Sequence, residues 1–488
     1  MYHPTEKEFN KLIKNNYIVQ LWKEISVGSE TPVSAYLKLG VNSPSCLLES
    51  IEGEQKFARY SFLILDPSVV FYSKNDLITI QRKNSKKHFK ANDPLNYLKK
   101  LFSDDKLKHD KMLPRLSGGA IGYIAYDYIH KIEKISNLKK PGLSLPELYF
   151  MFPKIVLSFD HLKQKVKIIR IVNPKEKINY RNACNDIEKI VNKLSAPILI
   201  NTIRSKSGII KSNTTKQQFI NAVKKAKKYI VDGDIIQTVL SQQLQTEFEG
   251  EPFEIYRALR ILNPSPYMYY FNLGDLKIIG ASPEILVRLE NNTANLRPIA
   301  GTRPRGKDDE EDKKLQKELL NDQKEKAEHL MLVDLGRNDL GRVCEFDSIK
   351  ISKFMSIEKY SHVMHMVSDI IGKIKNDTDA FELFKATFPA GTVAGAPKIR
   401  AMEILEEIES TKRGLYAGAV GYFDYNGNMD FAINIRTIIM KGKKAYIQAG
   451  AGIVADSVPE KEYEETLNKA RGLLKAIEMA ANKIVSGW

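Results

Sequence analysis

Cysteine is nearly missing from this sequence. The 488 residues include three cysteines, Cys46, Cys184 and Cys344. Three scattered thiols cannot build a disulfide framework or a cysteine-rich zinc site, both of which need more cysteines at regular spacings. We therefore expect a protein of a reducing compartment that folds without disulfides.

Long apolar runs are also missing. No stretch of about 18 consecutive apolar residues occurs, so the sequence offers no candidate for a membrane-spanning helix. The first residues, Met1-Tyr-His-Pro-Thr-Glu-Lys-Glu, do not place a basic segment before an apolar one. We expect no signal peptide, a cytoplasmic location and no membrane partner.

The charge pattern lacks the marks of a nucleic-acid-binding protein. Lys and Arg number 75 and Asp and Glu 59, which gives a formal net charge of +16. The excess is mostly lysine spread along the chain, without an arginine-rich arm, a zinc-finger spacing or a basic segment interleaved with aromatic residues. We interpret these lysines as a solvated surface and expect no nucleic-acid partner.

The composition is that of a large folded protein. Apolar residues make up 43% of the chain and charged residues 27%, and a chain of this length has two or three domains at about 100–200 residues each. The first 200 residues favour strands. We expect them at 62–65, 69–72 and 77–80, in a hairpin of 149–158 with 166–172, and in the glycine-dense, buried segment 118–127.

A helix at 179–194 and a polar linker at 201–213 end this first part. We place the domain boundary near 205–213, with an N-terminal domain 1–205 and a second domain 206–488. Thr214 and Gln217 have the spacing of a capping box, which predicts that a helix starts at Thr214. Further on, we expect strands at 276–280, 416–424, 431–440 and 445–449, and a long amphipathic helix at 461–485.

Two segments imitate known motifs. Gly301-x4-Gly306-Lys307 has the spacing of a phosphate-binding loop, but Asp308 stands where Ser or Thr would hold magnesium. His362-x-x-His365 could place two metal ligands on one helical face, but no third ligand follows at a telling spacing. We assign neither a nucleotide nor a transition metal to these segments.

Two pairs of glutamates have the spacing of one helical face. Glu325 and Glu328 precede an apolar run, and Glu462 and Glu465 are followed one turn later by Lys469. Such pairs most often form solvated salt bridges. Two pairs from distant helices could instead meet around one hard cation. Magnesium prefers oxygen ligands and keeps several waters, so one or two carboxylates and an anionic substrate suffice.

Several ordered segments together resemble the chorismate-utilising enzyme family. They span about residues 214–475 and are Arg297-Pro-Ile-Ala-Gly-Thr-Arg-Pro-Arg-Gly306, Ala327-Glu-His-Leu-Met-Leu-Val-Asp-Leu-Gly-Arg-Asn-Asp339, Val363-Met-His-Met-Val-Ser368, Phe388-Pro-Ala-Gly-Thr-Val-Ala-Gly-Ala-Pro-Lys398, Gly450-Ala-Gly-Ile-Val-Ala-Asp-Ser457 and residues 462–469. The resemblance implies an α+β fold: two intertwined domains of antiparallel β-sheets with helices packed outside.

Four features favour the branch of this family that makes anthranilate. Gln237 stands where isochorismate and salicylate synthases carry a lysine that activates water, and a neutral glutamine suits ammonia as the nucleophile. Ala300 stands where many 4-amino-4-deoxychorismate synthases carry a lysine. Leu47-Leu-Glu-Ser50 and Asn263-Pro-Ser-Pro-Tyr-Met268 resemble the two halves of a tryptophan inhibitor site.

The expected function is therefore that of the large subunit converting chorismate and ammonia to anthranilate and pyruvate, the first step of tryptophan biosynthesis. Three alternatives stay open. The first is the large component of a 4-amino-4-deoxychorismate synthase, and the second is an isochorismate-type hydrolytic enzyme. The third is a catalytically inactive, tryptophan-binding regulatory module.

The resemblance also implies roles for individual residues. Glu328 and Glu465 would bind Mg²⁺, with Glu325 and Glu462 nearby. Glu284 would be the general acid for the 4-hydroxyl group, since a carboxyl near other carboxylates has a raised pKa. His365 would take the proton from C2. Thr302 and Gln237 complete the expected catalytic set, and the expected substrate contacts are Thr302, Tyr416, Arg436, Gly450, Ala451, Gly452 and Lys469, with Lys398 balancing charge.

The resemblance implies partners as well. Neither Cys184 nor Cys344 lies in a glycine-flanked nucleophile turn, so ammonia would come from a separate glutamine amidotransferase subunit, in a hetero-oligomer of two plus two chains. L-Tryptophan would bind as feedback inhibitor at a second site, formed by Glu49, Ser50, Asn263, Pro266, Tyr267 and Met268.

Overall fold

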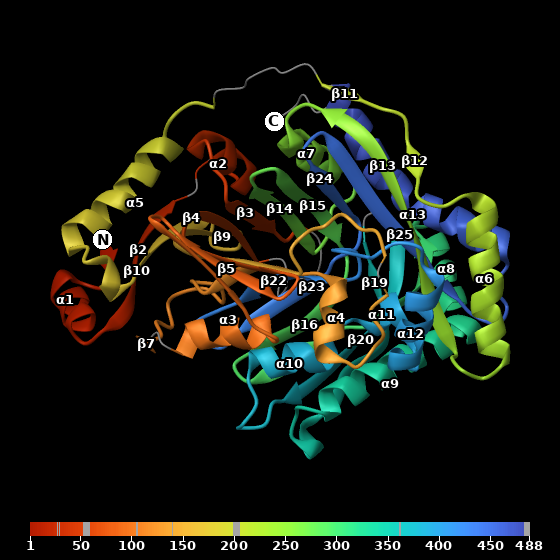
Figure 1. Cartoon of the computed structure of the whole chain (residues 1–488). Coiled ribbons are helices and arrows are strands. Elements are labelled where there is room, and N and C mark those ends of the chain that lie inside the picture. The colour runs from red at the N-terminus through yellow and green to blue at the C-terminus, as the bar shows by residue number, and fades with distance from the viewer. Residues whose placement is uncertain are drawn as a thin grey trace.

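The computed structural model describes residues 1–26, 28, 30–51, 59–103, 106–138, 140–198, 205–360 and 363–482 (Figure 1). Parts of three predictions lie outside the described residues. These are His362 of the histidine pair, residues 201–204 of the expected linker and residues 483–485 of the expected C-terminal helix.

Before residue 206 the strands are β1 (Tyr2–His3), β2 (Tyr17–Ser26), β3 (Ser45–Glu49), β4 (Tyr60–Lys74), β5 (Leu77–Arg82), β6 (Ser85–Lys90), β7 (Lys106–Leu107), β8 (Ala120–Ile124), β9 (Leu148–Asp160) and β10 (Lys165–Val172). The helices of this part are α1 (Glu6–Lys14), α2 (Pro32–Leu39), α3 (Pro94–Ser103), η1 (Tyr126–Tyr128), α4 (Ile129–Ile132), η2 (Pro174–Glu176) and α5 (Tyr180–Leu194).

From residue 206 the strands are β11 (Lys206–Ser207), β12 (Lys211–Ser212), β13 (Gln237–Glu249), β14 (Tyr267–Leu273), β15 (Leu276–Ser282), β16 (Ile285–Glu290), β17 (Thr293–Leu296), β18 (Ile299–Pro304), β19 (Lys350–Lys359), β20 (Val363–Lys373), β21 (Gly395–Ala396), β22 (Ala419–Phe423), β23 (Met429–Ile433), β24 (Thr437–Lys441) and β25 (Lys444–Ile453). The helices are α6 (Lys216–Val231), α7 (Pro252–Leu262), α8 (Asp309–Asn321), α9 (Gln323–Gly341), η3 (Phe346–Ser348), α10 (Ala380–Thr387), α11 (Gly391–Ala394), α12 (Lys398–Ile408) and α13 (Pro459–Ala481).

Two antiparallel arms of sheet diverge from the paired long strands β4 and β9. The first arm has the strand order β1-β2-β10-β9-β4-β3-β14-β15-β24-β25-β13. The second runs β6-β5-β4-β9-β8-β22-β23-β16-β17-β20-β19, and β18 follows β17 along the same edge of β20. Both halves of the chain contribute to both arms, so the two parts are intertwined and the α+β prediction is confirmed.

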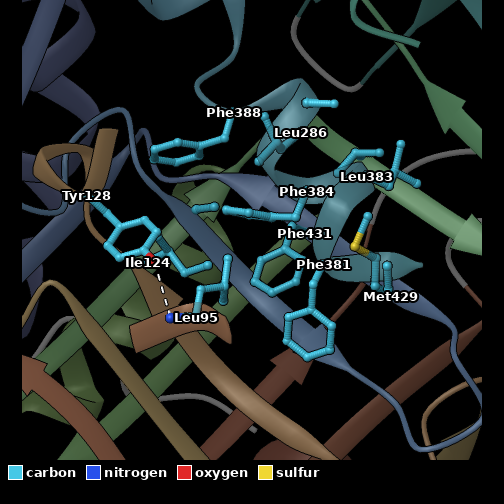
Figure 2. Packing of buried hydrophobic residues seen from close by; sticks show 14 of the residues in the cluster. Leu95, Ile124, Tyr128, Leu286, Phe381, Leu383, Phe384, Phe388, Met429 and Phe431 are labelled. Atoms are coloured by element: carbon cyan, nitrogen blue, oxygen red, sulfur yellow. Dashed lines mark hydrogen bonds between the residues drawn. The ribbon is translucent and has the colours of Figure 1, made fainter. Parts of the chain in front are cut away.

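The buried core also mixes the two halves. In one cluster, Leu95, Ile124 and Tyr128 pack with Phe381, Phe384 and Phe431 from the second half (Figure 2). The Tyr128 hydroxyl accepts a hydrogen bond from the Leu95 amide at 3.2 Å. Burying this aromatic surface stabilises the contact between the halves, at about 1.5–3 kcal/mol for each large side chain.

The strands shared by the two arms explain one difference from the sequence prediction. Residues 62–65 and 69–72 were expected as separate strands, but both belong to β4. The register against β9 shifts between Pro67 and Val69, and Asp66 has φ +46°. Because such a bulge bends a strand without ending it, the first part of β4 pairs with β3 and the second part with β5.

The expected strand 431–440 is interrupted. It consists of β23 and β24, which belong to different arms, and Arg436 between them has φ +51°. The helix predicted from Thr214 is capped one residue later, by Thr215 with Gln218. The hairpin of β9 and β10 and the buried strand β8 lie as predicted. A Cβ at Gly122 would lie 1.8 Å from the carbonyl oxygen of Tyr149 on the paired strand β9, so this position requires glycine.

Helices cover the outside of the arms. Helix α13 packs on β25 and on α7, and α9 packs on β18 and β20 (Figure 1). None of the helices within the described ranges is long and apolar enough to cross a membrane. The three cysteines are free thiols.

Candidate active site

The largest set of predicted site residues lines one cavity between the arms. Its volume is about 660 Å³. The chain crosses between the arms twice at this place, once from β15 to β16 through Glu284 and once from β23 to β24 through Arg436. The predicted residues in the lining are Gln237, Glu284, Thr302, Glu325, Glu328, Tyr416, Arg436, Gly450, Gly452, Glu462, Glu465 and Lys469.

The two glutamate pairs enter this cavity from different helices. Glu325 and Glu328 lie on α9, and Glu462 and Glu465 lie on α13. Both pairs therefore have the predicted helical spacing and face a common space. The sequence alone favoured solvated salt bridges for such pairs, and it is the packing of the two helices across the cavity that brings them together.

Each pair has a defined polar neighbour. The Gln237 amide donates a hydrogen bond of 3.1 Å to Glu328 Oε1. Lys469 Nζ lies 2.6 Å from Glu465 Oε1 and donates to the Gly450 carbonyl at 3.0 Å. These contacts hold both carboxylates without enclosing them, so they remain open to the cavity.

The carboxylates do not form a closed metal site. Across the described part of the chain, no three His, Cys, Asp or Glu side chains are arranged to hold a metal ion by themselves. Burial raises the pKa of Glu462, and repulsion by Glu465 acts in the same direction. Open, oxygen-only donors on facing helices fit Mg²⁺, which completes its coordination shell with water and substrate oxygens.

Glu284 is the buried acid of the cavity. Burial raises the pKa of its carboxyl group to about 8, against the smaller opposing effects of Thr392 and Lys469. The backbone around it is fixed, because the Ile433 amide donates to the Glu284 carbonyl at 3.0 Å and the Ser282 hydroxyl donates to the Ile433 carbonyl at 2.7 Å. At neutral pH this carboxyl group holds a proton that it can donate.

A basic and aromatic part of the wall lies next to the glutamate pair of α13. Arg436 is held by a 2.8 Å hydrogen bond from Nη1 to the Lys469 carbonyl. Burial raises the pKa of Tyr416 to about 12, so its hydroxyl stays protonated and can donate. Arginine and a phenol together suit the recognition of a carboxylate.

Glycines of β25 make room for this wall. A Cβ at Gly450 would lie 2.6 Å from the Tyr416 hydroxyl oxygen, and one at Gly452 would lie 2.7 Å from Gln237 Nε2. Ala451 lies between them on the opposite face of the strand, where it packs with the buried residues of α6. Its side chain therefore does not line the cavity, and the substrate contact expected of its backbone stays a prediction.

His365 lies beside the cavity rather than in its lining. It is on strand β20, not on a helix. Its Nδ1 is 3.0 Å from the Thr302 hydroxyl, which does line the cavity. Burial lowers the pKa of His365, so the imidazole is neutral at physiological pH. The segment that imitates a phosphate loop is strand β18 and the N-terminus of α8, where Asp308 caps the helix.

A second, smaller pocket collects most of the residues predicted for the inhibitor. Its volume is about 50 Å³, and its lining includes Glu49, Ser50, Pro266, Tyr267 and Met268. Strands β3 and β14 bring these segments together, with Met268 opposite Glu49. Asn263 ends α7 and lies outside the lining.

Some lining residues were given no role from the sequence. In the large cavity these are Lys324, Thr392, Gln448 and Ser457, and in the small pocket Arg115, Tyr422 and Asp430. Thr392 and Ser457 lie within segments that carry the family resemblance, but the pattern indicated no role for them. Arg115 and Asp430 approach to 3.6 Å across 315 positions of sequence, and spacing along the chain cannot indicate such a pair.

Comparisons with known proteins agree with this geometry. A family model described as chorismate binding enzyme matches residues 43–475. "Anthranilate synthase component 1" of Aquifex aeolicus is 47% identical over 481 residues, 97% of each chain. The protein of the same name from Acetivibrio thermocellus is 47% identical over 491 residues, 98% of this chain and 99% of the relative.

Solved structures give the same picture. Anthranilate synthase component I from Streptococcus pneumoniae superposes with a TM-score of 0.78 at 38% identity, covering 92% of this chain and 98% of that one. A menaquinone-specific isochorismate synthase from Escherichia coli has a TM-score of 0.72 at 18% identity, which shows the shared fold alone.

Proposed function

This chain belongs to the chorismate-binding enzyme family, and we propose that it is the large subunit of an anthranilate synthase, converting chorismate and ammonia to anthranilate and pyruvate. One observation carries the proposal. A protonated Glu284, an arginine–tyrosine wall and two open glutamate pairs line a single cavity in a chain 47% identical over 97% of its length to a protein named for this activity.

Charge balance supports Mg²⁺ as the cofactor. The cavity lining includes five glutamates against Lys324, Arg436 and Lys469. With Glu284 protonated, four carboxylates face these three cations, and one of the four, Glu325, also pairs with Arg303 at 3.1 Å. A dicarboxylate substrate would add two further negative charges. Mg²⁺ held by Glu328 and Glu465, with Glu325 and Glu462 nearby, would offset this excess and polarise the substrate carboxylate.

The side chains divide the remaining work. Tyr416 and Arg436 bind the enolpyruvyl carboxylate, beside the backbone of Gly450 and Gly452. Glu284 gives its proton to the departing 4-hydroxyl group, which leaves as water when ammonia adds at C2. The neutral imidazole of His365, in contact with Thr302, accepts the C2 proton as pyruvate leaves and the ring becomes aromatic.

The proposal extends to partners. The nucleophile would be ammonia from a separate glutamine amidotransferase subunit, in a hetero-oligomer of the two chains, and the enzyme would be a lyase of the cytoplasm. L-Tryptophan would bind as feedback inhibitor at the small pocket, whose volume of about 50 Å³ is smaller than an indole, so the lining would open on binding. Among the residues that the structure describes, the buried Ser50 hydroxyl has no hydrogen-bond partner, and Pro266, Tyr267 and Met268 offer an apolar surface for an indole.

Two variants of helix α9 test the proposal. The purified chain is given chorismate, Mg²⁺ and an ammonium salt at alkaline pH, and anthranilate fluorescence is followed. Glu328→Gln should abolish the signal, since it removes a carboxylate that faces the cavity. Asp334→Asn is the matched control, because Asp334 lies on the same helix with 78% of its side chain exposed, and it should retain the wild-type rate. Equal activity of the two variants would contradict the assignment.

A further inference from the structure

A buried ion pair lies directly behind the cavity wall. Arg413 and Glu409 have side chains that are 2% and 8% exposed. The guanidinium group donates to both carboxylate oxygens, from Nε to Oε2 and from Nη2 to Oε1, each at 2.8 Å. Neither side chain is in the cavity lining, so the pair does not itself meet the substrate.

The remaining donors of Arg413 reach two separate segments of the wall. Nη1 donates to the carbonyl of Val393 in α11 at 2.7 Å, and Nη2 donates to the carbonyl of Val239 in β13 at 2.5 Å. Val239 and Val393 both line the cavity. One guanidinium group therefore fixes the spacing of two chain segments that are 154 positions apart.

Glu409 extends the connection to a third segment. The Ser241 amide and hydroxyl donate to its Oε1 at 2.9 and 2.7 Å. Gln448 Nε2 then donates to the Ser241 hydroxyl at 2.9 Å, and Gln448 lines the cavity from β25.

The guanidinium group of Arg413 also contacts the aromatic ring of Tyr416. The guanidinium carbon lies 5.6 Å from the centre of the Tyr416 ring and 4.8 Å from that of Tyr126, which belongs to the N-terminal half. The Tyr416 amide donates to the Arg413 carbonyl at 3.1 Å. The tyrosine of the cavity wall is thus positioned by both the backbone and the side chain of Arg413.

We propose that Arg413 and Glu409 are positioning residues that set the place of Tyr416, Val239 and Gln448 for the substrate carboxylate. The inference rests on the proposed function. Because the two charges cancel, the pair adds no net charge to the cavity and acts through geometry. Lysine cannot replace this arginine, since one ammonium group cannot span the two carbonyls and the carboxylate in a planar fork.

Arg413→Lys tests this inference against a matched buried arginine. Arg170 is 4% exposed and pairs with Glu176 and Asp186 in the first arm, away from the cavity. Arg170→Lys therefore reports what the loss of a buried arginine does to stability alone. Melting temperature and the KM values for chorismate and for ammonium are measured for both variants.

We expect Arg413→Lys to raise the KM for chorismate by about 10- to 100-fold, the effect of misplacing a binding group by about 1 Å. The KM for ammonium should stay unchanged. Arg170→Lys should lower the melting temperature comparably and leave the KM for chorismate unchanged. Equal changes of this KM in the two variants, or no change in Arg413→Lys, would overturn the inference.

If Arg413→Lys does not fold, Ser241→Ala tests the positioning role instead. It removes one hydroxyl between Glu409 and Gln448 and should raise the KM for chorismate about fivefold, the equivalent of one hydrogen bond. An unchanged KM would overturn the inference.

If the wild-type chain makes no anthranilate, the proposed function fails. Calorimetric titration then compares the affinity of Arg413→Lys and of Arg170→Lys for chorismate. A weaker affinity in Arg413→Lys alone supports the positioning role, and equal affinities of the two variants overturn it.

Discussion

Replacing Glu284 by glutamine should abolish turnover and yet stabilise the protein at alkaline pH. The reason is the burial that raises the pKa of this carboxyl group to about 8. Glutamine has nearly the shape of a protonated glutamate and does not titrate. The variant therefore keeps the packing of the site and removes the cost of burying an acid.

The sign and size of the effect follow from the two pKa values. Below pH 4.5 the side chain is protonated in both the folded and the unfolded chain. Between pH 4.5 and about 8 the unfolded chain releases the proton while the folded chain keeps it, so the free energy of unfolding falls as the pH rises. The difference between the two pKa values corresponds to about 5 kcal/mol as an upper limit, reached above pH 8.

The measurement is urea unfolding followed by circular dichroism at pH 5 and pH 8.5, in the presence of EDTA so that no divalent cation binds the carboxylates. Glu284→Gln should unfold at clearly higher urea than the wild type at pH 8.5, with a much smaller difference at pH 5. Asp334→Asn, an exposed control, should show no such dependence. A variant that is less stable than the wild type at pH 8.5, or a difference independent of pH, would refute the reasoning.

Changes at the cavity and at the small pocket should each have a measurable effect. Gly450→Ala should raise the KM for chorismate and lower the free energy of unfolding by about 1–3 kcal/mol, because its Cβ would lie 2.6 Å from the Tyr416 hydroxyl oxygen; wild-type kinetics and melting would contradict this. EDTA should stop anthranilate formation and added Mg²⁺ should restore it, as followed by anthranilate fluorescence. A rate that neither EDTA nor Mg²⁺ changes would contradict the proposal that the glutamates bind a metal ion. Ser50→Ala should raise the inhibition constant of tryptophan about tenfold, as expected for a lost hydrogen bond to a charged group, and unaltered inhibition would place the inhibitor elsewhere.

The sequence predicted the fold class and the elements whose signal is local. The glutamate spacings on α9 and α13 are helical, and the hairpin of β9 and β10 lies as expected. The predicted start of α6 was one residue too early. The neighbouring pairs Thr214–Gln217 and Thr215–Gln218 both have the capping-box spacing, and the structure uses the second. The choice between the two registers depends on packing that the sequence does not display.

The break between β23 and β24 could not be predicted. Residues 431–440 favour a strand throughout, and the interruption arises because the two pieces pair in different arms. This long-range pairing gives Arg436 its positive φ and places it in the cavity. The ion pair of Glu409 and Arg413 was missed for a similar reason, since its four-residue spacing is shared by many exposed pairs.

The most direct test of the account is the identity of the product made from chorismate and ¹⁵N-ammonium by the purified chain with Mg²⁺. We expect anthranilate carrying ¹⁵N on the ring carbon next to the one that bears the carboxylate, with pyruvate released in equal amount, as read by NMR and mass spectrometry. A 4-aminated product that retains its enolpyruvyl group, or isochorismate without ¹⁵N, would contradict it.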